Sequence, residues 1–148
     1  GRRVTLDQIE HTILAEFGDP RVSLVLGRGA VGSGRLRSEA FGAKSIERQL
    51  EQSKAQFATS PRHAKVDALA GRVSISPILS WRAAAFIEQY ARDSFDLPRR
   101  ESIERAVIGF LRPHLLGAEE DFIRKNSFQR AYEPFDWRLN DLTGGRPD

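Results

Sequence analysis

The residues best suited to chemistry lie in one glycine-rich and arginine-rich stretch, VSLVLGRGAVGSGRLR, at positions 22–37. An apolar run comes first, and glycines then follow with the spacing Gly-x-Gly-x-x-Gly. Backbone N–H groups in such a turn can form a concave anion site, to which arginines add positive charge. The alternative, which we favour, is an irregular loop whose arginines are solvated. The residues assigned to an anion or nucleotide site are Gly27, Arg28, Gly29, Arg35 and Arg37.

The elements around this loop do not suit a dinucleotide site. Such a site needs a strand before the glycines, a helix directly after them, and an acidic residue about 20 positions later. Here a helix is predicted to precede the strand Val22–Leu26, and the segment after Gly32, SGRLRSEAFGAK, is a poor helix start. The positions around Glu51 lie inside a predicted polar helix, and no Walker-type lysine follows the glycines. The pattern therefore argues against nucleotide binding.

Ser33 is the candidate nucleophile of the loop, but a serine hydroxyl needs a base held beside it. The three histidines, His11, His63 and His114, lie far apart in the sequence, and none has a ligand-spaced partner. The chain contains no cysteine, which excludes disulfides and thiolate sites. We therefore expect no metal, no cofactor and no catalytic residue. A serine-dependent hydrolase that uses Ser33, with loop amides as its oxyanion hole, is kept as an alternative.

Composition and charge are those of an ordinary folded protein. Of the 148 residues, 40% are apolar and 29% are charged, and no apolar run approaches the roughly 20 residues that span a bilayer. The net charge is +3, and the basic residues are scattered among acidic ones, which argues against nucleic-acid binding. Because the sequence contains no methionine, we expect a processed or partial chain, with removal of an export signal as one explanation. This favours an exported, periplasmic protein, with a cytoplasmic one as the alternative.

Local patterns predict a single α+β domain over residues 1–148, with four to five helices on a small, mainly antiparallel sheet and a tail at 142–148. A capping box at Thr5 begins the first helix. The segment KVDALAGRVSIS predicts a hairpin that turns at Ala70–Gly71. The segment FQRAYEPFDWRLND predicts an edge strand that runs into a structured turn. The remaining helices are predicted at 46–58, 77–90, 101–111 and 118–125.

The two tryptophans are candidates for contacts with other proteins, because buried aromatic anchors dominate interface energetics. Trp81 begins an apolar helix, which favours packing in the core. Trp137 lies in the segment PFDWRLN, where Asp136 and Asn140 are predicted to brace a turn through side-chain-to-backbone hydrogen bonds. We interpret this motif as structural first. The residues predicted to form an interface are Phe135, Trp137 and Arg138.

Four segments occur in an order and spacing that resemble a known family. They are VTLDQIEHTIL, GDPRVSLVLGRGAVGSGRLRSEAF, SISPILSWRAAAF and PFDWRLND, and together they span Val4 to Asp141. The set resembles the bacterial and plant family catalogued as domain of unknown function 547. The resemblance implies that this chain corresponds to the C-terminal portion of the family domain, because the family's upstream segment, with its W-I-N-x-Y-N-like helix, has no counterpart here.

The resemblance also implies that a Cys/His site has been lost. The family's strand histidine falls at Ser23, and its two loop cysteines fall at Arg28 and Ser33. Its paired prolines fall at Gly34 and Arg35. On this basis the Gly-x-Gly-x-x-Gly spacing is an accident of cysteine replacement. The positions that match the family pattern are Gly29, Ala30, Leu36, Arg37, Phe135, Asp136, Trp137, Leu139 and Asn140.

We therefore expect a catalytically inactive descendant of this family that serves as a non-catalytic accessory or scaffolding subunit of a larger protein assembly. A fold that keeps its core and loses its reactive groups has only its surface left to act with. Its partners are expected to be proteins in a membrane-associated assembly, although this chain has no apolar run long enough to span a membrane itself. The Ser33 hydrolase and an anion or nucleotide binder at the Gly27–Arg37 loop are the alternatives.

Overall fold

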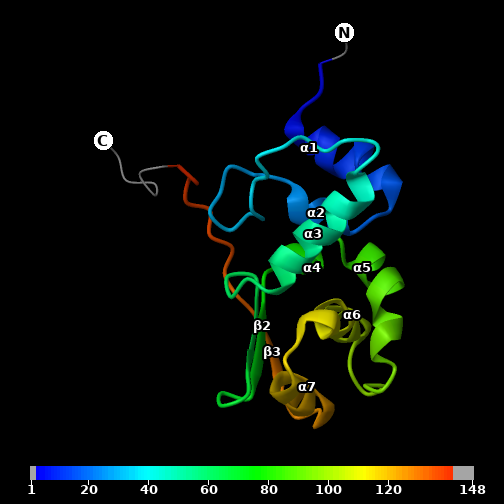
Figure 1. The fold of residues 1–148 in the computed structure, drawn as a ribbon, viewed down its shortest axis with the longest axis vertical. Helices are drawn as coiled ribbons and strands as arrows, with labels where there is room; N and C mark the ends of the chain where they lie inside the picture. The colour runs from blue at the N-terminus through cyan, green and yellow to red at the C-terminus, as the bar shows by residue number, and fades with distance from the viewer. Residues whose placement is uncertain (1–2, 142–148) are drawn as a thin grey trace.

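The computed structural model describes residues 3–141 and has an α+β architecture, which confirms the predicted fold class. The predicted tail at 142–148 lies outside the described residues. Figure 1 shows the arrangement of the elements. The helices are α1 (Leu6–Gln8), α2 (Arg21–Val25), α3 (Ile46–Ala58), α4 (Ile78–Trp81), α5 (Ala83–Tyr90), α6 (Ser102–Leu111) and α7 (Gly117–Arg124). Shorter turns are the π-helical η1 (Ile9–Ile13) and the 3-10 turns η2 (Ala15–Phe17), η3 (Ala91–Ser94) and η4 (Arg112–His114). The strands are β1 (Ala64–Asp67), β2 (Arg72–Ile75) and β3 (Gln129–Tyr132).

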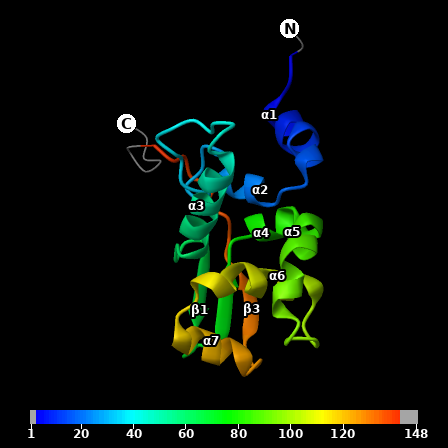
Figure 2. The same ribbon diagram turned by 45° about the vertical axis from the view of Figure 1, so that its right-hand side comes forward.

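The sheet has the order β1-β2-β3 and is mixed. The predicted hairpin forms β1 and β2, which pair antiparallel, and Gly71 takes a positive φ of 65° at the turn that joins them. The predicted edge strand forms β3, which pairs parallel to β2 with Val73 opposite Arg130. A parallel neighbour requires a long crossover, and the chain makes it through α4 to α7 before it returns. Helices α6 and α7 lie beside the sheet (Figure 2).

The core centres on α6. The Phe110 ring meets the rings of Phe57, Phe86 and Tyr90 edge-on, with centroids 5.4 to 6.3 Å apart. This edge-to-face geometry is the favoured one for aromatic pairs. Gly109 lets α6 approach α5 closely, because a Cβ at this position would lie 2.1 Å from the Tyr90 carbonyl oxygen. The predicted apolar faces of the helices at 77–90 and 101–111 therefore form one continuous core with β2 and α7.

The strand predicted at Val22–Leu26 is wrong, because this segment forms α2. Pro20 precedes the helix with a helical φ of −65°, and the Asp19 carboxylate accepts a hydrogen bond of 2.9 Å from the Arg21 backbone N–H. These are helix-start signals, although in the sequence they directly follow another helix. Packing of α2 against α3 then outweighs the preference of its valines for a strand.

Residues 4–17 form an irregular helical segment, called here the N-terminal helical segment. The predicted capping box is present, since the Gln8 N–H donates to the Thr5 hydroxyl and the Thr5 N–H to the Gln8 side chain. Beyond it the helix passes through η1 and η2 and ends at Gly18, whose φ is 65°. The segment stands away from the rest of the molecule in Figure 2. Its apolar residues Leu6 and Phe17 are 85% and 71% exposed, so a large part of its apolar face stays uncovered.

None of the helices within residues 3–141 combines the length and the apolar character required of a membrane-spanning helix.

Candidate functional site

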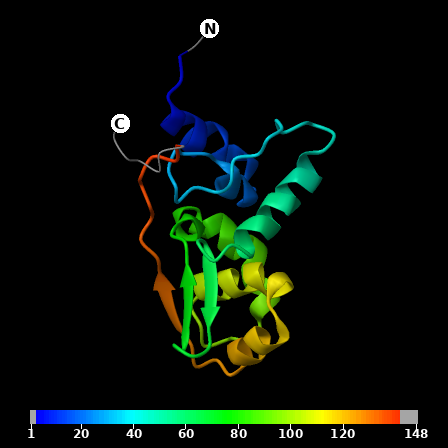
Figure 3. The same ribbon diagram turned by 60° about the vertical axis from the view of Figure 1, so that its left-hand side comes forward.

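The glycine-rich loop is held by the C-terminal segment. The Gly32 N–H donates to the Asp136 carbonyl and the Val31 N–H to the Arg138 carbonyl, both at 2.9 Å. A Cβ on Gly32 would lie 2.8 Å from the Asp136 backbone nitrogen, so a side chain here would push the two segments apart. Figure 3 shows the C-terminal segment running from the sheet to this loop. Glycine at position 32 therefore allows the backbone of the loop to approach the backbone of the C-terminal segment closely.

The neighbouring glycines have structural roles of the same kind. Gly29 has a φ of 67°, a region that glycine adopts without steric cost, and its carbonyl accepts from the Asn140 N–H at 2.8 Å. Gly34 lies against the end of α2, where a Cβ would come within 1.9 Å of the Leu24 carbonyl oxygen. The loop's glycines thus permit its packing on α2 and on the C-terminal segment.

The residues predicted to form an anion site at Gly27–Arg37 do not converge on one position. Arg28 forms an ion pair with Glu10, and its guanidinium lies 4.8 Å from the centroid of the Trp81 ring. Arg37 pairs with Glu39 at 2.7 Å, on the side of the loop that faces α3. Arg35 alone of the three forms no ion pair or hydrogen bond with any residue in 3–141, and its side chain is exposed.

Ser33 is turned into the loop. It is 8% exposed, and its hydroxyl oxygen accepts a hydrogen bond of 3.1 Å from the Arg28 backbone N–H. Within residues 3–141 no imidazole is hydrogen-bonded to it: His11 lies beside Asp7 on the N-terminal helical segment, and His114 belongs to η4. The arrangement that would activate this serine as a nucleophile is not formed by the described residues.

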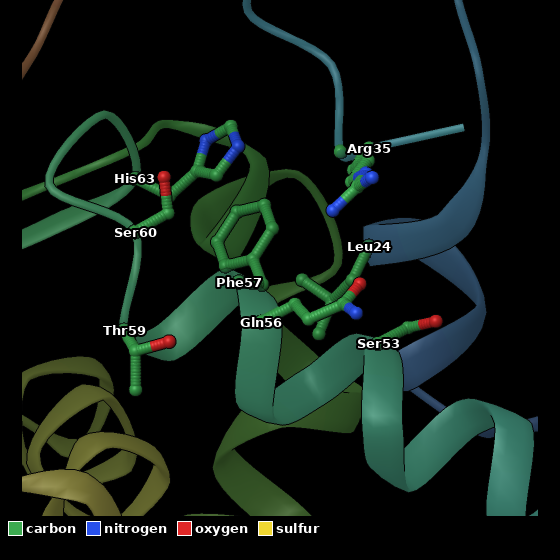
Figure 4. Close-up of a pocket in the computed structure, with 9 residues that line it drawn as sticks. Leu24, Arg35, Ser53, Gln56, Phe57, Thr59, Ser60 and His63 are labelled. Carbon is green, nitrogen blue, oxygen red and sulfur yellow. The ribbon is translucent and has the colours of Figure 1, made fainter. Parts of the chain in front are cut away.

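His63 lines a small pocket that the sequence did not predict, called here the His63 pocket. It measures about 250 Å³ and lies between the end of α2, the turn at Gly34–Arg35 and the C-terminal half of α3 (Figure 4). Arg35 and His63 stand on opposite sides of it in that view. The lining residues are Leu24, Gly34, Arg35, Ser53, Gln56, Phe57, Thr59, Ser60 and His63.

The turn that follows α3 positions the His63 imidazole. Its ring stacks on the Phe57 ring, with centroids 4.1 Å apart and planes 6° apart, and the residue is only 7% exposed. Burial, together with the nearby positive charge of Arg62, lowers the pKa of His63 below its usual range. The ring is therefore neutral near pH 7, with one donor and one acceptor nitrogen. Neither nitrogen forms a hydrogen bond with the described residues, and neither is a fully buried atom.

A wider groove lies on the other side of the loop, between it and the N-terminal helical segment, and is called here the aromatic groove. Its volume is about 770 Å³. Apolar side chains form most of its walls, and carboxylates of the N-terminal helical segment lie along one edge. The lining residues are Leu6, Asp7, Ile9, Glu10, His11, Leu26, Gly27, Arg28, Gly29, Trp81 and Trp137.

Of the predicted interface residues, Trp137 lines this groove, whereas Phe135 and Arg138 line a separate hollow of about 340 Å³. Trp137 is 68% exposed and stacks on Trp81, with centroids 6.2 Å apart. Phe135 is partly buried and contacts both indoles. Its ring centroid lies 5.0 Å from that of Trp81 and 4.4 Å from that of Trp137. Arg138 is exposed and pairs with Asp136 at 2.6 Å. That contact and the Arg138 N–H lower the pKa of Asp136 to about 2. The Arg138 N–H donates to the Asp136 carboxylate at 3.1 Å, which confirms the predicted bracing by Asp136, whereas the Asn140 side chain forms no hydrogen bond with the described residues.

The chain matches no protein-family model, no curated protein and no solved structure. The resemblance to the family of unknown function 547 therefore stays a prediction.

Two features of these sites cannot be predicted from the sequence. Trp81 is predicted to pack in the core. It does pack against core residues, but it also lines the aromatic groove. The sequence places His63 far from the other histidines and without a ligand-spaced partner, and it does not indicate a pocket there, because the neighbours of His63 in the pocket come from separate segments. The helical spacing of Leu6 and Ile9 indicates an apolar helix face, and this face lines one side of the aromatic groove.

Proposed function

We propose that this protein is a non-catalytic binding module, an accessory subunit whose partner inserts an apolar segment into the aromatic groove. The observation that carries the proposal is the exposed stack of Trp137 on Trp81 at the edge of that groove. Tryptophan anchors of this kind, surrounded by other apolar contacts, provide most of the binding energy in many interfaces.

Apolar exposure around the groove supports this proposal. Leu6 is 85% exposed, Trp137 68% and Leu139 59%, and all three belong to the two segments that border the groove or continue from it. Contiguous exposed apolar surface is rare on proteins that act alone and is typical of interaction sites. A partner that covered these side chains would gain the free energy of removing them from water.

The charges of the N-terminal helical segment indicate the chemistry of the partner. Residues 4–17 contain Asp7, Glu10 and Glu16 and neither lysine nor arginine. Glu10 is already paired with Arg28, whereas the Asp7 side chain is 84% exposed beside Leu6. We therefore assign the groove to an apolar protein segment that carries lysine or arginine opposite Asp7, since complementary charge fixes register and excludes wrong partners.

The resemblance to the family of unknown function 547 fits this proposal. The positions that correspond to the family's loop cysteines hold Arg28 and Ser33. In this protein the two residues contact each other, and Arg28 also holds Glu10 and Trp81. The former reactive positions thus support the groove wall, and we propose that binding has replaced catalysis.

Site-specific photo-crosslinking in the natural source tests the proposal. A benzoyl-phenylalanine at position 137 reports on the groove, and one at position 69 is the control, because Leu69 is fully exposed in the β1–β2 turn, at the opposite end of the molecule from α1 (Figure 1). We expect a discrete adduct from position 137 that position 69 does not give. The captured protein is then purified, and its binding to the unmodified chain is measured.

The purified partner should bind the unmodified chain through a segment rich in apolar and basic residues. Trp137→Ala and Asp7→Lys should each weaken that binding at least tenfold, whereas Leu69→Ala should leave it unchanged. Equal adducts from positions 69 and 137, or affinity that survives both groove substitutions, would overturn the proposal.

A further inference from the structure

We propose that the His63 pocket binds a small organic monocarboxylate, whose carboxylate pairs with the Arg35 guanidinium and shares a hydrogen bond with the His63 imidazole. The pocket is separate from the aromatic groove, with which it shares no lining residue. The proposal therefore does not depend on the protein partner.

Arg35 supplies the charge. Its neighbours Arg28 and Arg37 are neutralised by Glu10 and Glu39, whereas Arg35 has no acidic partner among residues 3–141. Gly34 brings this arginine to the pocket, since only a residue without a side chain can pack against the Leu24 carbonyl oxygen. The planar guanidinium presents two parallel N–H groups, a geometry that matches a carboxylate.

His63 supplies a polar group that lacks a partner. The residue is more than nine-tenths buried, yet its ring nitrogens form no hydrogen bond with the described residues. Neither ring nitrogen is among the buried side-chain atoms without a partner in residues 3–141, so the nitrogens stay accessible and can bond a ligand that enters the pocket. Figure 4 shows the ring at the rim of the pocket, across from Arg35.

The total charge of the lining selects the class of anion. The lowered pKa of His63 leaves its ring neutral near pH 7, and no other lining residue except Arg35 carries a charge. Arg62 acts on His63 from outside the lining, so Arg35 is the one cation that a ligand in the pocket can contact, and this suits a monoanion better than a phosphate, which carries about −1.5 to −2 near neutral pH. The pocket therefore favours a carboxylate over a phosphate group.

The size and the remaining walls limit the rest of the ligand. About 250 Å³ lies below the roughly 300–1,000 Å³ typical of sites for drug-sized molecules. Leu24 and Phe57 provide apolar surface, while the Ser60 and Gln56 side chains form no hydrogen bond with the described residues. A carboxylate on a short apolar body fits these walls, and benzoate is a suitable probe.

Nuclear magnetic resonance titration of the full chain tests this assignment through the ring signals of His63. Benzoate should shift those signals in a saturable way, whereas benzamide, which has the same body without the charge, should not. Arg35→Gln should weaken benzoate binding at least tenfold. Arg99→Gln is the matched control, because Arg99 is also exposed and forms no ion pair within residues 3–141.

A second variant separates the role of the imidazole from that of the charge. His63→Phe keeps an aromatic ring against Phe57 and removes the hydrogen bond, so calorimetry should record a benzoate affinity at least threefold lower. Three results would overturn the proposal: no effect of benzoate on His63, equal binding by Arg35→Gln, or shifts with inorganic phosphate as large as those with benzoate.

Discussion

The Gly34 backbone lies so close to the Leu24 carbonyl oxygen that a side chain at position 34 would overlap it, with a Cβ at 1.9 Å. This contact joins the arginine-rich loop to the end of α2 and so forms one corner of the His63 pocket. The loop's shape is therefore fixed by backbone packing, and its charged side chains point to separate places as a result.

Gly34→Ala is expected to lower the free energy of unfolding by about 2 kcal/mol or more, because the loop must move away from α2 to admit the methyl group. Benzoate binding should fall with it. Gly117→Ala is the matched control: position 117 lies in α7 with open space around it, so alanine should be neutral or raise stability by about 0.5–1 kcal/mol. Urea denaturation of both variants checks the difference, and equal stabilities would contradict the contact's role.

Trp137→Ala should separate binding from stability. The ring is 68% exposed, so its removal forfeits mainly the stacking with Trp81 and Phe135, worth about 1 kcal/mol of unfolding free energy. Partner affinity should fall by about 2 kcal/mol or more, the range of an interface anchor. Denaturation and direct binding assays give the two values, and a loss confined to stability would rule out an interface role.

Arg21→Met should loosen the junction of α2 with α3. The Arg21 side chain is 10% exposed and contacts carboxylates of Asp19, Glu47 and Glu51 at 2.6 to 2.7 Å. Removing the cation leaves these carboxylates facing one another, which should lower the unfolding free energy by about 2 kcal/mol, because the glutamates stay partly solvated. Arg92→Met, at an exposed arginine without an ion pair in residues 3–141, should change it little.

His63 should make the protein sensitive to mild acid. Its pKa is lower in the folded protein than the unfolded value near 6.5, so between the two values only the unfolded chain binds the proton. Stability from this residue is complete above about pH 6.5 and is lost as the pH falls toward the folded pKa. His63→Phe should therefore lose less unfolding free energy than the unmodified chain between about pH 7 and pH 5. A steeper loss in the variant would contradict the buried, neutral ring.

Ser33 should not react with a fluorophosphonate. Its hydroxyl oxygen accepts from the Arg28 N–H, the residue is buried, and no imidazole within residues 3–141 is hydrogen-bonded to it. Mass spectrometry of the treated protein should find no adduct at this position. Labelling that disappears in Ser33→Ala would instead support the hydrolase alternative and count against a purely binding role.

Local sequence signals predicted those elements whose boundaries depend on neighbouring residues. The helix predicted at 46–58 has the bounds of α3, and the hairpin turns where Ala70–Gly71 indicated. The segment FQRAYEPFDWRLND predicts an edge strand that runs into a turn, and its first part forms β3, which ends before Pro134. The sequence does not predict that β3 pairs parallel to β2, because the register of β3 on β2 depends on the whole crossover between them.

Tertiary contacts explain what the sequence could not predict. The segment Val22–Leu26 has a strand-like composition, but it forms a helix that is tied to α3 by the ion pair of Arg21 with Glu47. The Gly-x-Gly-x-x-Gly pattern resembles a phosphate loop, but its last glycine, Gly32, packs against the Asp136 backbone, and Gly34, two residues later, packs against Leu24. Similarly, nothing near His63 in the sequence indicates that Arg35 lies across a pocket from it, since two separate elements bring them together.

The segment from β3 to Asn140 fastens the two ends of the molecule together. It completes the sheet beside β2 and then pairs with Gly29–Gly32, far up the chain. It is synthesised after the loop and after both of the other strands of the sheet. Because Gly29, Val31 and Gly32 find their backbone partners in this segment, neither that pairing nor the stack of Trp137 on Trp81 can form until the segment has been synthesised.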